Sequence, residues 1–265
     1  MIGTRCVPAF VSVGAMGTFG LVLTATDALD RQLYPFVRAQ RFTMLKVVTG
    51  WGIGRPWTFA DRARVLAMTP RTIVRTIAGD PSYRAGAFLY PEPKHVIAET
   101  WPWCEIQPHI AIEIGNEPNV TPGWNDDMAW AYRYWLEQLL PQMRHVYPDA
   151  YLIAPGPSFM HPGAARYLEI CADVMRGFDA VAVHVYGFHS LNEPGVRDVR
   201  WAYDRLFDAR MPRWITELGI REPARDVNRL ALYRDFTNQL APPWLGACVY
   251  HYGADRQINP EYHVG

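Results

Sequence analysis

Residues 112–119 read IEIGNEPN, an apolar run of strand type that ends abruptly in Asn-Glu-Pro. Proline has no backbone N–H to donate to a sheet, so the chain is expected to leave its strand at this point. Glu117 therefore lies where a strand opens into a loop. A carboxylate in that position is outside the packed layer and can face a ligand.

The rest of the chain repeats the same strand pattern. Eight stretches of strand type occur, at residues 19–25, 42–50, 71–79, 109–117, 150–156, 178–186, 213–219 and 245–252. Seven helical patterns lie between them, at residues 27–40, 58–68, 92–101, 125–143, 163–176, 194–209 and 224–240. Strict alternation predicts a parallel sheet, and eight such units in about 250 residues match an α/β fold of the (β/α)8 type, the TIM barrel, better than an open doubly wound sheet.

One domain is expected, because 265 residues that are 49% hydrophobic suffice for one large core. Residues 1–17 form an N-terminal arm in this interpretation, and residues 18–265 form the barrel. Gly265 follows Tyr252 by only 13 residues, so the eighth helix should be short or missing. Three explanations stay open: the arm covers the gap, another subunit covers it, or the chain is a fragment.

Charge and local motifs exclude several classes of partner. The 26 Lys and Arg residues balance the 26 Asp and Glu residues, so no strong field exists to recruit nucleic acid or an anionic membrane. No dinucleotide-binding GxGxxG motif and no P-loop motif follows the first strand. A neutral or locally recognised ligand is therefore expected.

The apolar stretch after Arg5, CVPAFVSVGAMGTFGLVL, faintly resembles a signal peptide. Its proline and glycines interrupt a continuous apolar helix, and no clear cleavage site of small residues follows. A membrane span needs about 18 uninterrupted apolar residues, which this stretch lacks. We expect a soluble protein, without a convincing signal peptide and with no assigned compartment.

Neither cysteines nor histidines show the spacing of a metal site. The cysteines lack CxxC spacing and are expected to be buried thiols: Cys6, Cys104, Cys171 and Cys248. No HExxH-like pattern relates the histidines outside the strands, which include His161, His189 and His263. We expect no metal and no other cofactor.

In a barrel of this kind the chemistry lies at the carboxyl ends of the strands. Glu117 ends the fourth strand, and Glu217 ends the seventh in ITELG. Alternation along the fourth strand places Glu113 below Glu117, inside the barrel. A buried carboxylate needs a partner, and Lys46 or Arg75 can supply it from the second or third strand.

Two carboxylates across a barrel mouth suit glycoside hydrolysis, in which one protonates the leaving oxygen and the other attacks the anomeric carbon or activates water. Different neighbours can separate the pKa values of two such carboxyls. His184 and Tyr186 share one face of the sixth strand and can hydrogen-bond the second carboxylate. Asn116 can reach a sugar hydroxyl.

Three motifs, IGNEPN at the fourth strand, HVY at the sixth and TELG at the seventh, resemble those of the retaining glycoside hydrolases of clan A. The resemblance implies a (β/α)8 barrel with catalytic glutamates on strands four and seven. It implies that Glu117 is the general acid/base, that Asn116 contacts the sugar 2-hydroxyl and that Glu217 is the nucleophile. The His-x-Tyr pair corresponds to His184 and Tyr186.

The chain departs from that clan at three positions. Lys46 stands where the clan usually has an Arg on the second strand, and it lacks the fork of an Arg. A His common on the third strand has no counterpart, and Arg75 lies nearby. The Trp that commonly floors the sugar subsite on the eighth strand is missing, with Tyr250 or His251 closest to its place.

Aromatic side chains near the strand-to-helix loops can stack on sugar rings, although core packing is the better interpretation for any single one. They are Trp51, Trp57, Trp101, Trp103 and Trp124. As a set, with Trp51 just past the second strand, they favour a glycan cleft over a small-ion pocket. The full set of predicted substrate-binding residues is Asn116, His184, Tyr186, Trp51, Lys46, Arg75 and Tyr250.

The sequence thus predicts a retaining O-glycoside hydrolase that cleaves a β-linked oligo- or polysaccharide by double displacement. The main alternative is a catalytically silent carbohydrate-binding or regulatory barrel. A third and weaker alternative is an aldolase or lyase that uses Lys46, which lies deep in the barrel. The pattern does not identify the sugar, endo or exo cleavage, or the oligomeric state.

Overall fold

A computed structural model describes most of the chain. The described residues are 18–23, 33–49, 56–76, 91–120, 123–159, 161, 163–188, 194–220 and 229–252. The N-terminal arm of residues 1–17 lies outside this part, as do Cys6 and Trp51.

Eight parallel strands form one closed ring in the order of the sequence. They are β1 (Thr18–Leu23), β2 (Met44–Val48), β3 (Arg71–Arg75), β4 (Ala111–Glu113), β5 (Tyr151–Ala154), β6 (Ala180–Phe188), β7 (Arg213–Ile220) and β8 (Trp244–Tyr252). The seam closes because β1 pairs with β8, with Thr18 opposite Gly246. The predicted (β/α)8 barrel is confirmed, and every predicted strand is present.

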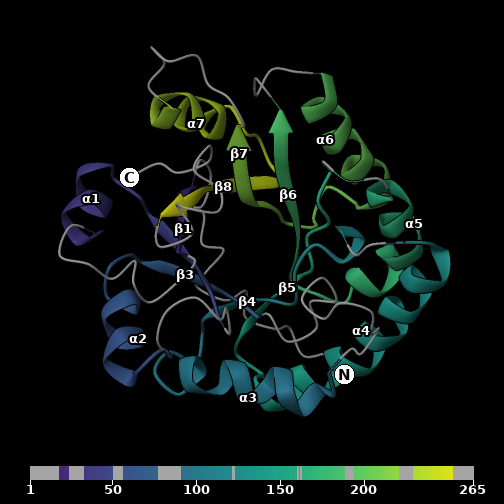
Figure 1. Cartoon of the computed structure of the whole chain (residues 1–265), viewed down its shortest axis with the longest axis horizontal. Coiled ribbons are helices and arrows are strands. Elements are labelled where there is room, and N and C mark those ends of the chain that lie inside the picture. The colour runs from purple at the N-terminus through teal and green to yellow at the C-terminus, as the bar shows by residue number, and fades with distance from the viewer. Residues whose placement is uncertain are drawn as a thin grey trace.

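Helices surround the ring on its outer side (Figure 1). They are α1 (Leu33–Ala39), α2 (Phe59–Leu66), α3 (Pro93–Cys104), α4 (Asp126–Val146), α5 (Ala164–Met175), α6 (Pro194–Leu206) and α7 (Arg229–Asn238), with a short 3-10 turn, η4 (Pro118–Val120), after β4. The Asn125 side chain caps α4 by accepting a hydrogen bond from the backbone N–H of Met128 at 3.0 Å. Within the described residues, no helix combines the length and the hydropathy that a membrane span requires.

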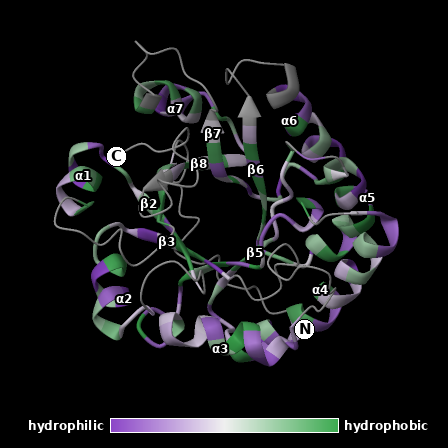
Figure 2. Ribbon diagram, in the orientation of Figure 1, coloured by the Kyte–Doolittle hydropathy of each residue, from purple (hydrophilic) through white to green (hydrophobic). Residues whose placement is uncertain are grey.

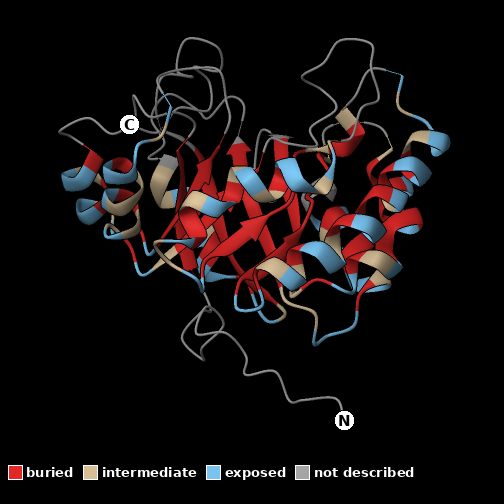
Figure 3. Ribbon diagram, turned by 90° about the horizontal axis from the view of Figure 1, so that it is seen from below, coloured by how far each residue is buried: buried red, intermediate tan, exposed pale blue. Residues whose placement is uncertain are grey.

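Two apolar layers hold the barrel together. Alternate strand residues such as Leu21, Leu45 and Val74 pack outward against the helices, and the others, such as Val22 and Ile73, fill the interior. The strands are accordingly hydrophobic and buried, whereas the helices carry an exposed polar face (Figures 2 and 3). Burial on both faces explains why the strands read as near-continuous apolar runs.

Helix α7 covers the seam of the barrel, because it contacts both β8 and β1. Arg234 on α7 lies over the Phe19 ring of β1 at 5.1 Å and donates to the backbone oxygen of Gln40, just beyond α1. Among the described residues, seven helices therefore surround eight strands.

Several elements are shorter than predicted. Strand β4 ends at Glu113, four residues before the predicted end, because the backbone turns to positive φ at Gly115 (66°) and Glu117 (29°). Helices α1 and α7 begin at Leu33 and Arg229, and the preceding residues of both predicted helices lie outside the described part. The described cysteines, Cys104, Cys171 and Cys248, are free and buried, as predicted.

Candidate active site

Glu117 occupies the exit of β4 in a backbone conformation that is unusual for a residue with a side chain. Its φ of 29° is positive, which costs on the order of 1 kcal/mol or more for a non-glycine residue. The turn also ends the strict alternation of the strand, so that Asn116 and Glu117 both reach the other polar groups of the site. Strain of this kind is typical of positions whose geometry serves a function.

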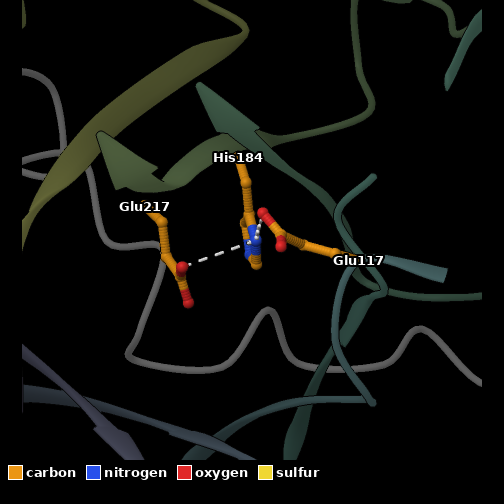
Figure 4. Close-up of side chains that lie close together, drawn as sticks. All are labelled: Glu117, His184 and Glu217. Carbon is orange, nitrogen blue, oxygen red and sulfur yellow. Dashed lines mark hydrogen bonds and ion pairs between the residues drawn. The ribbon is translucent and has the colours of Figure 1, made fainter. Parts of the chain in front are cut away.

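His184 lies between the two glutamates at the barrel mouth (Figure 4). Its Nδ1 is 3.0 Å from Oε1 of Glu117 and 3.6 Å from Oε2 of Glu217. One carboxylate oxygen of each glutamate and this nitrogen all lie within 4.8 Å of one another. The two glutamates predicted to face each other therefore do so across a single imidazole.

Glu217 on β7 is almost fully enclosed and bound by three donors. Its Oε1 meets the Arg75 guanidinium and, at 2.9 Å, the Lys46 ammonium. Its Oε2 accepts a hydrogen bond from the Tyr186 hydroxyl. Burial alone would raise the pKa of Glu217, but the charges of Arg75, His184 and Lys46 outweigh it and hold the pKa well below its usual range.

Arg75 joins the two sides of the mouth. It projects from the end of β3, and its Nη1 donates both to Oδ1 of Asn116 and to Oε1 of Glu217. Because Asn116 accepts through its oxygen, its amide nitrogen stays available as a donor. An Arg thus reaches Glu217 from the third strand although Lys46 occupies the expected place on the second.

A third carboxylate, Glu113, lies beneath the other two. It has no exposed surface, and its Oε2 is 2.7 Å from the Lys46 ammonium. Its Oε1 is 3.0 Å from Nε2 of His184 and accepts a hydrogen bond from the Thr216 hydroxyl at 3.0 Å. The predicted burial of Glu113 and its predicted contact with Lys46 are confirmed.

Lys46 and Arg75 contact carboxylates of the site, and in addition His184 and Asn116 respectively. Their side chains are 0% and 2% exposed, so neither presents a surface to a ligand in this structure. Direct contact of either residue with sugar stays a prediction. What the geometry adds is that both hold Glu217 in place.

Two tyrosines form one wall beside Glu217. The rings of Tyr186 and Tyr250 meet edge to face, with centroids 5.3 Å apart. Burial, with Glu217 alongside, raises the pKa of Tyr186 well above its usual value, so its hydroxyl stays protonated and donates. Tyr250 on β8 therefore lies close to the site, as predicted, although its contact with sugar stays a prediction.

Three tryptophans of the predicted aromatic set, Trp57, Trp103 and Trp124, pack in the apolar layer beneath the helices, and Trp51 lies outside the described residues. Trp57 packs edge to face on Trp103 at 5.4 Å, and Trp124 packs on Tyr167 at 6.2 Å, all in the layer beneath the helices. Trp101 is about half exposed on α3. Core packing explains most of the described tryptophans, and a glycan cleft that includes Trp51 stays a prediction.

Asn119 is a positioning residue that sequence reasoning missed. Its side chain is buried and accepts from the Ser158 backbone N–H at 2.9 Å while donating to the Ser158 carbonyl at 2.8 Å. Ser158 in turn lies beside His184, in an isolated bridge that extends the pairing of β5 with β6. Asn119 therefore ties the loop of Glu117 to the strand of His184. The only signal in the sequence is its place in NEPN.

The atoms of Glu117, His184 and Glu217 are close enough together to suggest a metal site. The donor set argues for a different use. Both oxygens of Glu217 already meet donors, and two of these, Lys46 and Arg75, are cations that would repel a metal ion. We assign no metal to this cluster.

No family model matches the chain, and no curated protein sequence matches it. Solved structures with a similar fold include the β-mannanase of Thermomonospora fusca, at 12% sequence identity and a TM-score of 0.60. The alignment covers 88% of this chain and 78% of the mannanase. The chain shares its barrel fold with glycoside hydrolases.

Two further glycoside hydrolases extend the comparison. The catalytic domain of the endoglucanase Cel5A of Thermobifida fusca is 18% identical, with a TM-score of 0.57 and coverage of 91% of this chain and 81% of that domain. The GH39 enzyme of Xanthomonas axonopodis pv. citri is 14% identical, with a TM-score of 0.55 and coverage of 89% of this chain. This chain spans 59% of the length of the GH39 enzyme. At these identities the likeness establishes the fold.

Proposed function

We propose that the protein is a retaining O-glycoside hydrolase that cleaves a β-linked saccharide by double displacement. The observation that carries the proposal is the pair formed by Glu117, just past β4, and Glu217 on β7, whose nearest oxygens lie within 4.8 Å. Retaining enzymes hold their two carboxyls about 5 to 5.5 Å apart, whereas inverting enzymes leave room for a water between them. The short separation supports retention.

Glu217 has the surroundings of a nucleophile. Arg75, Lys46 and Tyr186 bind its two oxygens and keep it ionised, which an attack on the anomeric carbon requires. The same donors hold the carboxylate in one orientation. Because these donors are already in place around the buried carboxylate, its surroundings need little reorganisation during the reaction.

Glu117 has the surroundings of the acid/base. Its side chain is 16% exposed, more than the 4% of Glu217, so it can meet both a leaving group and a water molecule. Asn116 beside it keeps an amide donor available for a sugar hydroxyl, since its oxygen is bound by Arg75. In the first step Glu117 protonates the leaving oxygen, and in the second it takes a proton from water.

The fold of the neighbours supports a saccharide as substrate. The Thermomonospora fusca β-mannanase with a similar fold was solved in complex with mannohexaose. A neutral oligosaccharide also suits a chain with balanced charge. The sugar itself and its linkage position are left open by the site.

The alternative of a silent binding barrel rested on the missing strand-two Arg and strand-eight Trp. Arg75 supplies a guanidinium to Glu217 from the neighbouring strand, so the missing strand-two Arg no longer argues strongly for a silent barrel. The aldolase alternative needs a Lys that can reach substrate. Lys46 is fully enclosed and paired with Glu113 and Glu217, which argues against a Schiff base there.

The decisive experiment compares aryl β-glycosides with good and poor leaving groups. Glu117→Ala should lower turnover of poor leaving groups about 10²–10⁴-fold, because they need protonation. With a very good leaving group the first step should survive and the second should stall. Added azide should then restore turnover and give a β-glycosyl azide, identified by NMR.

Glu217→Gln is the matched control. It should abolish turnover of both substrates, and added azide should not restore the double-displacement reaction. A Glu117→Ala protein that is equally inactive toward both leaving groups and insensitive to azide would remove Glu117 from the acid/base role. A glycosyl azide of inverted configuration would overturn retention. Binding of oligosaccharides without any turnover by the wild type would favour the silent barrel.

A further inference from the structure

His184 contacts a carboxylate on each edge of its ring. Nδ1 lies 3.0 Å from Glu117, and Nε2 lies 3.0 Å from Glu113. Both glutamates come from the same strand end, one above the other, and the imidazole bridges them from β6. Glu113, the deeper of the two carboxylates, has no exposed surface at the mouth. The proposed reaction gives it no role.

The charges of the cluster cancel before His184 and Glu117 are considered. Lys46 and Arg75 carry two positive charges, and ionised Glu113 and Glu217 carry two negative charges. An enclosed cluster is most stable when its net charge is close to zero. One proton shared between Glu117 and His184, on the carboxyl or as an imidazolium, would keep the enclosed cluster neutral.

Glu113 decides which ring nitrogen can share that proton. Oε1 of Glu113 can only accept, so its 3.0 Å contact with Nε2 is a hydrogen bond when Nε2 carries a hydrogen, and this is the protonation of the ring that we infer, with Nδ1 facing Glu117. The Lys46 ammonium, 3.2 Å from Nε2, opposes a full positive charge on the ring. Glu113 and Lys46 thus act on His184 in opposite directions from below.

The geometry points to Glu113 as the positioning residue of the acid/base: by fixing the tautomer and charge of His184, it sets how firmly the Glu117–His184 pair holds its proton. This inference rests on the proposed function only in the role given to Glu117. Burial alone would lower the pKa of His184, but Glu217, Glu113 and Glu117 raise it above the ordinary value despite Lys46.

The proton balance of this arrangement closes within the two-step reaction. Before the first step the shared proton lies on Glu117 or on Nδ1 of His184, and it passes through Glu117 to the leaving oxygen. In the second step water gives a proton to the same pair as its oxygen attacks the glycosyl-enzyme. Glu113 keeps its charge throughout, and Nε2 keeps its hydrogen.

Charged and titratable groups face this imidazole from several strands, and a test must separate their effects. They are Lys46 on β2, Arg75 on β3, Glu113 and Glu117 at β4, Tyr186 on β6, Glu217 on β7, and Tyr250 on β8 behind Tyr186. Glu113 differs from the rest in meeting Nε2 with a negative charge. Only its substitution removes the acceptor of that nitrogen.

The test is a 15N NMR titration of the imidazole of His184 in the whole protein, assigned with a His184→Asn variant. Glu113→Gln removes the charge and should lower the His184 titration midpoint by about one pH unit or more. Thr216→Val is the matched control, since it removes an uncharged contact to the same oxygen of Glu113. The control should titrate close to the wild type.

Activity gives a second measurement. The alkaline limb of the pH–rate profile for a poor leaving group should shift to lower pH in Glu113→Gln by a similar amount, because the pair loses its proton more readily. A general loss of structure would instead lower the rate without moving the limb. If no glycoside is turned over, the proposed function fails while the NMR titration still decides the role of Glu113.

Two results would overturn the inference. One is a His184 midpoint unchanged in Glu113→Gln, and the other is a wild-type ring that carries no hydrogen on Nε2. Should Glu113→Gln fail to fold because Lys46 is left unpaired, Glu113→Leu combined with Lys46→Met removes both buried charges together. In that protein the neutral tautomer should change to Nδ1–H, and retention of Nε2–H would equally contradict the inference.

Discussion

At the scale of single residues, the contacts at the barrel mouth give Arg75 and Tyr186 different roles toward Glu217. Arg75 binds Asn116 and Glu217 through one nitrogen, whereas Tyr186 binds only the other oxygen of Glu217. The cation should therefore contribute more to the ionisation of Glu217 than the phenol does. This ranking matches the main causes of the lowered pKa of Glu217, where Arg75 is the largest influence that opposes burial.

Substitution can test this ranking. Tyr186→Phe should move the acidic limb of the pH–rate profile to higher pH, because it removes a donor that stabilises the charged form of Glu217. Arg75→Met should move the same limb further, by about 1 to 3 units, because it removes a cation. Profiles of kcat/KM measured from pH 3 upward check both. A larger shift in Tyr186→Phe than in Arg75→Met would contradict the assigned order.

The residues themselves were partly predictable. Glu117, Glu217, His184 and Tyr186 could be found because strand ends in a barrel converge on one mouth. The contact between Arg75 and Glu217 could not be predicted, because it depends on how far a long side chain reaches across the ring. Periodicity likewise gives no sign of the positive φ at Glu117.

At the scale of elements, the loop after β4 is held to the neighbouring strands by side chains. Asn119 in η4 binds both backbone groups of Ser158, which lies against His184 on β6. The order of the strands was predictable from alternation, since each strand of a barrel pairs with its sequence neighbours. The attachment of Asn119 to Ser158, called the Asn119 clamp below, was not predictable. It consists of side-chain hydrogen bonds to backbone groups, which produce no periodic pattern in the sequence.

Asn119→Ala should weaken both stability and activity. Loss of two buried hydrogen bonds should cost about 1 to 3 kcal/mol of unfolding free energy, measured by urea denaturation. The rate with poor leaving groups should fall more than the rate with good ones, because the loop that holds Glu117 can shift.

Asn125→Ala is the matched control from the same segment. It removes the exposed N-cap of α4 and should cost about 1 kcal/mol of unfolding free energy. Its dependence on the leaving group should equal that of the wild type. Equal kinetic profiles for Asn119→Ala and Asn125→Ala would show that the Asn119 clamp serves stability alone.

At the scale of the whole molecule, the barrel encloses a charged interior within an apolar frame. Glu113 and Glu217 have pKa values below the ordinary range although burial opposes this, because Lys46 and His184 face Glu113 while Arg75, His184 and Lys46 face Glu217. His184 has a pKa above its ordinary value. The free energy of unfolding should therefore decrease both toward acidic and toward alkaline pH.

The signs follow from linkage. The two carboxyls stabilise the fold above their unfolded pKa of about 4.3, and this contribution is lost as the pH falls through their lowered folded values. His184 stabilises the fold below its unfolded pKa of about 6.5, and that contribution is lost as the pH rises through its raised folded value. Maximal stability is expected between about pH 4.5 and 6.5.

Urea denaturation followed by circular dichroism between pH 3 and 9 checks this window. Lys46→Met should lower the unfolding free energy by about 3 to 5 kcal/mol near pH 6, because it leaves Glu113 uncompensated. Glu137→Gln, which breaks the exposed pair with Arg133 on α4, should change it by less than about 1 kcal/mol. A flat pH dependence in the wild type would contradict the electrostatic account.

The seam between β1 and β8 also bears on the order in which the molecule folds. It joins Thr18 to Gly246, whereas β1 and β2 pair through a much shorter loop, so the seam carries the largest loss of chain entropy. Long-range pairing of this kind makes folding slow. Lys46 and Glu113 lie inside the ring with no exposed surface, so we expect them to lose their hydration water only when the ring closes, and the free-energy cost of that loss to fall on the closing step.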